Sequence, residues 1–173
     1  TCAIDDSGLK CWGFNDYGQT NVPDLSKPKM VAAGDLHTCA VDDSSVKCWG
    51  YNNHRQTDVP ALSNPKVVAA GFGHTCAIDD SGLKCWGWNT FGQTNVPALS
   101  NPKAVATGYA HTCAIDDSGL KCWGLNTYGQ TNVPALSNPR IVDVGSHLSC
   151  ALDDSGLKCW GINNHGQANV PEL

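Results

Sequence analysis

Short alternating and apolar runs, separated by turn residues, fill the chain and predict β-strands. The run "KVVAAG" at 66–71 is apolar and ends in glycine, whereas "HTCAID" at 74–79 alternates polar and apolar side chains, as a half-buried strand does. The turn "DDSG" at 79–82 has the Asp and Gly positions that a type I turn favours, and "LKCWG" at 83–87 returns as the next strand. The segment "NxxGQTNVP" then predicts a loop and a short strand that proline ends. No segment carries helical periodicity over three turns, so we expect an all-β fold.

The same pattern recurs with a constant step of 37 residues. One set of cysteines falls at 2, 39, 76, 113 and 150, and a second set at 11, 48, 85, 122 and 159. The repeat divides a single domain, 1–173, into units 1–37, 38–74, 75–111, 112–148 and 149–173, of which the last is incomplete. Three to four short strands per unit, in tandem, are typical of a β-propeller, with a solenoid as the weaker alternative.

The recurring phrase "WGxNxxGQ", preceded by "AGxxHTxA", resembles the repeat of the regulator of chromosome condensation (RCC1) propellers. The short unit ending in "VP" is most similar to the bacterial propeller-type β-lactamase inhibitor proteins. The resemblance covers the whole chain and implies a seven-bladed ring, for which seven units need roughly 260 residues. We therefore expect a part of such a ring, and the opening at Thr1 is read as that of a mature or partial chain. The alternative is a five-bladed ring in which one blade lacks its "KVVAAG" strand.

The two cysteines of each unit flank the turn, which predicts a disulfide within each hairpin. With Asp5 to Gly8 as the loop, Cys2 lies opposite Cys11 at about disulfide reach, although a bulged three-residue loop would shift the register by one. Structural zinc sites favour cysteines two to four residues apart, and five copies of one reactive thiol make little sense. Pairing between units, such as Cys11 with Cys39, would leave two cysteines without a disulfide partner. The expected disulfide cysteines are Cys2, Cys11, Cys39, Cys48, Cys76, Cys85, Cys113, Cys122, Cys150 and Cys159.

Composition narrows the class of protein. A formal net charge of −5 argues against nucleic-acid binding, which needs a basic surface to displace counterions. No apolar run approaches the ~20 residues of a membrane span. Ten cysteines indicate an oxidising compartment, so we expect an extracellular, cell-surface or periplasmic protein.

The order of strands and loops predicts two chemically different faces. The "DDSG" turns lie at one end of each hairpin and carry ten of the sixteen acidic residues, beginning with Asp5 and Asp6. Paired carboxylates could bind Ca²⁺, but a calcium loop needs more oxygen ligands at fixed spacing than these turns offer. We interpret the first Asp as a cap of its own turn and the second as solvated.

The "AGxx" and "WGxNxxGQ" loops share the opposite face, and there the units differ from one another. Large aromatic side chains on loops of a rigid scaffold are typical of protein-binding hot spots. The alternative is that residues such as Phe14 and Trp88 pack between blades. The candidate partner-binding residues are Tyr17, Asp35, Tyr51, His54, Phe72, Trp88, Phe91, Tyr109, Tyr128 and His165.

Residues that are constant between units are interpreted as scaffold. The Trp of "LKCWG" is expected to pack between blades. His37, His74 and His111 are expected to be buried and bonded to backbone rather than to form a metal or catalytic ring, because the fourth copy has Leu148. In the second unit Arg55 replaces a loop glycine and Ser45 a turn glycine, which implies modest strain or a specific contact by Arg55.

These features favour a secreted, protein-binding scaffold propeller. We expect no enzymatic activity and no cofactor, because no catalytic constellation occurs once in the sequence. A carbohydrate-binding or adhesin module is the first alternative, since aromatic side chains lie beside Asn in the "WGxN" loops. A structural subunit of a larger assembly is the second.

Overall fold

The computed structural model describes residues 1–43 and 45–171, which form fourteen strands and no helix. The strands are β1 (Cys2–Asp5), β2 (Gly8–Cys11), β3 (Pro28–Ala33), β4 (His37–Asp42), β5 (Ser45–Gly50), β6 (Val67–Ala70), β7 (His74–Asp79), β8 (Gly82–Gly87), β9 (Ala104–Thr107), β10 (His111–Asp116), β11 (Gly119–Gly124), β12 (Ile141–Val144), β13 (Leu148–Asp153) and β14 (Gly156–Gly161). The all-β prediction is therefore confirmed for the described residues.

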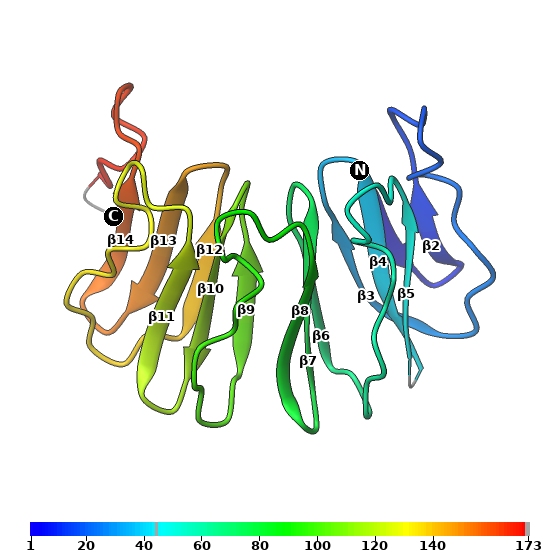
Figure 1. The fold of residues 1–173 in the computed structure, drawn as a ribbon, viewed down its shortest axis with the longest axis horizontal. Helices are drawn as coiled ribbons and strands as arrows, with labels where there is room; N and C mark the ends of the chain where they lie inside the picture. Colours follow the sequence, from blue (N-terminus) through cyan, green and yellow to red (C-terminus); the bar gives the residue numbers. More distant parts are fainter. Residues whose placement is uncertain (44, 172–173) are drawn as a thin grey trace.

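The strands form five antiparallel sheets that stand side by side as the blades of an open arc (Figure 1). Blade 1 is the hairpin β1–β2, and blades 2 to 5 each have three strands, as in the order β6-β7-β8. The inner strands β3, β6, β9 and β12 contact one another in sequence along the arc. The first and last blades lie at opposite ends of the molecule in Figure 1. The five blades thus have propeller architecture without closing on one another.

Each blade begins earlier in the sequence than the 37-residue unit counted from its hairpin, because the inner strand of a blade comes before that hairpin. Residues 66–70 lead into β6, which pairs with β7 in the register Val67↔Ile78 to Ala70↔Thr75. Blade 1 of the described chain lacks the equivalent of β6, so the edge of β1 away from β2, where the inner strand of the other blades pairs, has no partner strand. The short strand predicted at "NVP" is wrong: residues 95–97 are loop, where the Val96 N–H bonds the Thr94 carbonyl at 3.0 Å instead of a neighbouring strand.

Every hairpin is closed by a disulfide between its two strands. In blade 3, β7 and β8 pair from His74↔Gly87 to Asp79↔Gly82, which places Cys76 opposite Cys85. The five bonds join cysteines nine residues apart, with Cα atoms 4.0–4.1 Å from each other. None of the ten cysteines remains free, so the predicted pairing within units is confirmed.

One repeated set of hydrogen bonds joins successive blades. Between blades 2 and 3, the hydroxyl of Thr75 and the indole N–H of Trp86 both donate to the backbone carbonyl of Gln56, at 2.8 and 2.9 Å. Nε2 of His37 lies 2.8 Å from the same Thr75 hydroxyl. Because that hydroxyl gives its single proton to Gln56, the histidine must donate through Nε2. The imidazole is fully buried, and burial lowers the pKa of His37 to about 4.

The set recurs at the next two blade junctions. His74 contacts the hydroxyl of Thr112, and His111 that of Ser149. The histidines are buried as expected, but their partner is a hydroxyl of the next blade, not the backbone. The Trp side chains donate to the preceding blade, as the packing interpretation predicts, at Trp49, Trp86, Trp123 and Trp160.

Glycines hold the loops of adjacent blades in close approach at the inner edge of the arc. A Cβ atom on Gly71 would lie 2.5 Å from the Gly108 carbonyl oxygen and 2.8 Å from the His74 ring. The same carbonyl accepts the Phe72 N–H at 3.2 Å, and the Asp35 N–H in turn reaches the Gly71 carbonyl at 3.3 Å. The variable residues of the "AGxx" loops therefore stand on a backbone that is bonded from blade to blade.

The turn aspartates act largely as interpreted. The Asp79 carboxylate is buried and accepts hydrogen bonds from Ser81 in its own turn, from the Ser63 N–H and from Lys84. Burial alone would raise its pKa, but these bonds hold the pKa of Asp79 below its usual range. The second residue, Asp80, is exposed and forms an ion pair with Lys66 at 2.7 Å. Residues 1–43 and 45–171 contain no cluster of three acidic, His or Cys side chains suited to a metal.

The two departures of the second unit differ in their backbone. Arg55 takes a φ of 63°, which a side chain adopts at a modest cost, as the sequence predicts. In the turn, the positive φ falls on Asp43, at 50°, rather than on Ser45. Ser45 therefore needs no left-handed conformation, and the expected strain at that residue is wrong.

Removing one hairpin disulfide tests how far each blade depends on it. The double substitution Cys76→Ser with Cys85→Ser lowers the free energy of unfolding by about 2–3 kcal/mol, because an open loop of this length gains chain entropy when unfolded. Urea unfolding followed by circular dichroism measures the change. If the urea midpoint were unchanged, and the wild-type protein contained no free thiols, the disulfide would contribute nothing to stability.

The buried histidines make stability depend on mildly acidic pH. Folded His37 and His111 have pKa values of about 4, and burial, with the neighbouring histidines, lowers the pKa of His74 to about 3. The unfolded chain, with His near 6.5, binds more protons below that pH, so stability present at pH 7 is lost as the pH falls from about 6.5 towards 4. Thermal melting across this window measures the slope.

The variant His74→Leu, which repeats the natural residue Leu148 of the fourth copy, provides the matched control. It loses a hydrogen bond to Thr112, worth about 1 kcal/mol, and is less stable at pH 7.5. Its melting temperature nevertheless falls less steeply between pH 6.5 and 4, because one titrating group is gone. An unchanged slope would mean that the histidines do not govern acid sensitivity.

Candidate interaction face

Ten ring-bearing side chains form one connected cluster across all five blades, on the face opposite the acidic turns. Each ring lies within 6.3 Å of another, centroid to centroid, so the cluster is continuous from Phe14 to Tyr128. We call it the aromatic band. Its members are Phe14, Tyr17, Tyr51, His54, Phe72, Trp88, Phe91, Tyr109, Tyr128 and His147.

Trp88 is the centre of the aromatic band. Its ring lies 5.5 Å from that of Phe91 and 5.6 Å from that of Tyr109, both edge-on, and it stacks on His54 at 5.8 Å. Its indole N–H donates to the Thr90 hydroxyl at 2.6 Å. Trp88 is half-buried and therefore contacts rings from three blades.

The loops that carry the band are held by their own side chains. In the loop after β8, the Asn89 side chain accepts the Thr94 N–H at 2.9 Å and donates to Asn95 at 2.8 Å. The buried Gln93 side chain accepts the N–H of Phe91 at 2.9 Å. The other loops repeat these bonds, for instance at Asn126. The backbone of each loop that carries the rings is thus held by hydrogen bonds within that loop.

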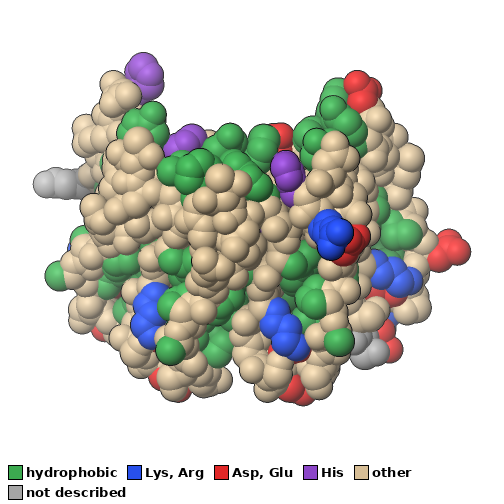
Figure 2. Space-filling model, viewed as in Figure 1, with side chains coloured by type: hydrophobic (Ala, Val, Ile, Leu, Met, Phe, Trp, Pro, Cys, Tyr) green, Lys and Arg blue, Asp and Glu red, His purple; other side chains and the backbone are tan. Residues whose placement is uncertain are grey.

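Exposure separates the edges of the band from its middle. In the described chain Phe14 is 57% exposed, and Phe91 and Tyr128 are 43% and 47% exposed. Phe72 and Tyr109 are half-buried against each other, with ring centroids 4.6 Å apart. Figure 2 shows hydrophobic side chains and histidines gathered along the upper edge of the molecule, between two raised ends. The face is therefore apolar and concave.

Eight of the ten predicted partner-binding residues belong to the band, and two do not. Asp35 lies beside the band and carries no ring, and His165 is exposed on the loop after β14 without a ring contact in the described residues. The prediction missed Phe14 and His147. Phe14 occupies the same loop position as Tyr51 and Trp88, and His147 follows a variable position, so the repeat alignment carried the signal for both.

A shallow groove of about 260 Å³ lies among the "AGxx" loops, at the inner edge of the arc. We call it the axial groove. Its floor is made of small residues such as Ala70 and Gly108, and its rim carries the variable residues Asp35, Phe72 and Tyr109. Two band members therefore also line the groove, which joins the two features into one surface.

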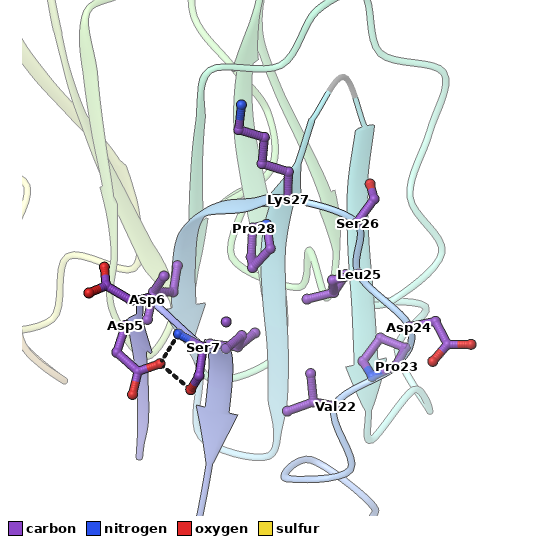
Figure 3. Close-up of a pocket in the computed structure, with 13 residues that line it drawn as sticks. Asp5, Asp6, Ser7, Val22, Pro23, Asp24, Leu25, Ser26, Lys27 and Pro28 are labelled. Atoms are coloured by element: carbon purple, nitrogen blue, oxygen red, sulfur yellow. Dashed lines mark hydrogen bonds between the residues drawn. The ribbon is translucent and has the colours of Figure 1, made fainter.

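Larger hollows of about 480 and 540 Å³ lie at the opposite end of the hairpins. Figure 3 shows the one beside blade 1, where the Asp5–Ser7 turn faces residues 22–28. Asp5 bonds only Ser7 and Lys10 and is exposed, whereas Asp79 also receives a backbone N–H from the segment before its inner strand. The hollow thus lies beside the one sheet of the described chain that has two strands instead of three.

No helix in residues 1–43 or 45–171 is long and apolar enough to cross a membrane.

Comparison with known proteins identifies the repeat. Residues 30–56, 66–93 and 103–130 match the regulator of chromosome condensation (RCC1) repeat, while no curated protein matches the chain. The ectodomain of the Physcomitrella patens receptor kinase CR4 superposes with a TM-score of 0.78 and 26% identity, over 98% of this chain and 51% of that one.

Two further structures are similar. The CRINKLY WD40 ectodomain of the Arabidopsis thaliana receptor kinase ACR4 has a TM-score of 0.72 and 26% identity, over 89% of this chain and 57% of that one. Yeast RCC1 (Prp20), solved bound to Kap60, has a TM-score of 0.74 and 19% identity, over 88% of this chain and 48% of that one. The chain spans about half the length of these proteins, and the similarity to β-lactamase inhibitor proteins stays a prediction. The matched repeats and the similar structures show that this chain contains RCC1 repeats and has a propeller fold.

Proposed function

We propose that the chain is a non-catalytic propeller that binds another protein through the aromatic band. The observation that carries the proposal is the continuity of the band across five blades, at positions where otherwise near-identical repeats differ. Tyr and Trp side chains on a preorganised surface give large contact area at little cost in entropy. Yeast RCC1, which shares the fold, is described in complex with Kap60 and as binding Gsp1p and histones.

The carbohydrate alternative receives less support from the loops. Sugar recognition by the "WGxN" loops requires free amide groups beside the rings, but the Asn89 amide is bonded within its own loop on both its oxygen and its nitrogen. The same holds at Asn15, Asn52, Asn126 and Asn163. Asn amides that are already bonded within their own "WGxN" loops favour a protein surface over a glycan.

We further propose an extracellular location. All ten cysteines form disulfides, which persist in oxidising compartments and are rare in the cytosol. Two of the similar structures are receptor-kinase ectodomains, at 26% identity.

The arc is proposed to be part of a larger, seven-bladed ring. Trp12 of blade 1 is 53% exposed, because no preceding blade in the described chain offers the carbonyl that Trp86 uses, and the edge of β1 is unpaired. An exposed blade face with unused donors is a template for another blade. The similar structures are about twice as long as this chain.

Extending the chain tests one part of this proposal, namely that the unpaired edge of β1 is the site of a further strand. A copy of residues 63–74, fused to the N-terminus of Thr1, reproduces the context of Thr75, so the added strand pairs with β1 in the register of Val67↔Ile78. We expect a higher melting temperature and slower amide exchange in β1. The control extension carries Pro at the position of Val68, which breaks the strand ladder. Equal stability of both extensions would contradict the proposed strand site.

Substitution on the aromatic band tests protein binding. The immobilised chain, Phe91→Ala and Trp88→Ala are compared for capture of proteins from the medium or surface fraction of the source cells. We expect a defined partner whose affinity falls at least tenfold in Trp88→Ala and less in the more peripheral Phe91→Ala.

The matched control is Asp80→Asn on the opposite face, which retains the partner with unchanged affinity. Circular dichroism melting of each variant excludes unfolding as the cause of any loss. Capture that depends on Asp80 and not on the rings would overturn the proposal, and specific binding on a glycan array without a protein partner would favour the carbohydrate alternative.

A further inference from the structure

We propose that the axial groove receives a lysine or arginine side chain from the partner, so that the aromatic face recognises a basic segment. This inference rests on the proposed function and adds the chemistry of the partner. It stands on one juxtaposition: the free carboxylate of Asp35 and the rings of Phe72 and Tyr109 line the same groove.

The Asp35 carboxylate has no partner within the described part of the chain. Its backbone N–H bonds the Gly71 carbonyl, which fixes the residue at the rim of the groove, and its side chain is exposed. By contrast, the turn carboxylates of the opposite face, such as Asp79 and Asp80, are held by lysines and hydrogen bonds. A carboxylate left free on a preorganised rim is suited to a cation from outside.

The dimensions of the axial groove fit a single side chain. Its volume of about 260 Å³ is below the roughly 300–1,000 Å³ of small-molecule sites. The lining includes the small residues Ala33, Ala70, Gly71 and Gly108, which leave room for a slim, unbranched stem. The glycines cannot be larger, because a Cβ on Gly71 would meet the Gly108 carbonyl at 2.5 Å.

The rings supply the second half of the recognition. Phe72 and Tyr109 lie 4.6 Å apart between centroids and stand on adjacent blades whose backbones are bonded to each other. Aromatic faces attract cations and also cover the methylene stem of lysine or arginine. An aliphatic anchor would use the rings and leave Asp35 unused, which is why the carboxylate decides in favour of a cation.

Charge on the whole face has the matching sign. The loops of this face carry Asp16, Asp35 and Asp58, against Arg55 as their basic residue other than histidine. Most lysines of the chain instead form ion pairs with aspartates at the acidic turns, on the opposite face. The aromatic face therefore attracts a basic segment and repels an acidic one.

The test uses short peptides and does not require the natural partner. The ¹⁵N-labelled chain is titrated with acetyl-Gly-Gly-Lys-Gly-Gly-amide and with its arginine, norleucine and Nε-acetyl-lysine counterparts, and amide shifts are followed by NMR. We expect saturable shifts at Asp35, Phe72 and Tyr109 with the lysine and arginine peptides. The two uncharged peptides leave these amides unshifted.

Two matched variants separate the groove from general charge attraction. Asp35→Asn weakens binding of the lysine peptide roughly fivefold or more, whereas Asp16→Asn, which removes the same charge from the same face outside the groove, changes the affinity less than about twofold. Equal binding of the norleucine peptide, an unchanged affinity of Asp35→Asn, or shifts confined to the acidic turns would each overturn the proposal.

The groove and the proposed function can fail separately. Capture lost in Trp88→Ala, with no peptide binding, would leave the proposed function standing and show that the groove assignment is wrong. Peptide binding without a captured protein would support the groove and count against protein binding through the whole band.

Discussion

The backbone carbonyl of Gln56, which accepts one hydrogen bond from a threonine and one from a tryptophan of the next blade, is the interaction on which the structure depends. The same arrangement recurs at each blade junction, around a buried Thr or Ser hydroxyl whose loss of a partner would be costly. At three junctions a neutral histidine completes it. A 37-residue repeat has little core of its own, so these junctions and the hairpin disulfides replace the large apolar core that other domains use.

Because the junctions and disulfides do not involve the ring positions of the loops, the amino acids at those positions can differ between repeats. Gln93 and Asn89 hold their loop through backbone and side-chain bonds, and neither needs a particular residue at the position of Phe91. The band can therefore be composed of Tyr, Trp, Phe and His without disturbing the blades. The acidic turns show the opposite behaviour, because each buried Asp is tied to its own turn and to a neighbouring segment, and these turns hardly vary.

Much of this could be predicted from sequence, because it follows from spacing along the chain. The step of 37, the opposition of Cys76 and Cys85, and the sorting of loops onto two faces need only strand pairing rules. Sequence could not show the close approach of Gly71 to Gly108, which depends on the angle between blades. It also mispredicted a strand at "NVP", where proline and a local bond end the ladder. The band as a continuous surface, including His147, emerged only once the blades were placed side by side.

Hydrogen–deuterium exchange of the chain, alone and with its captured partner, tests most directly whether the aromatic band is the binding surface. We expect slower exchange in the loops of the aromatic face, at residues 35–36, 51–55, 72–73, 88–91 and 109–110. The turns at 79–82 and 116–119, on the opposite face, should exchange at unchanged rates. Protection confined to those turns, with the aromatic loops unaffected, would contradict the claim that the band is the binding surface.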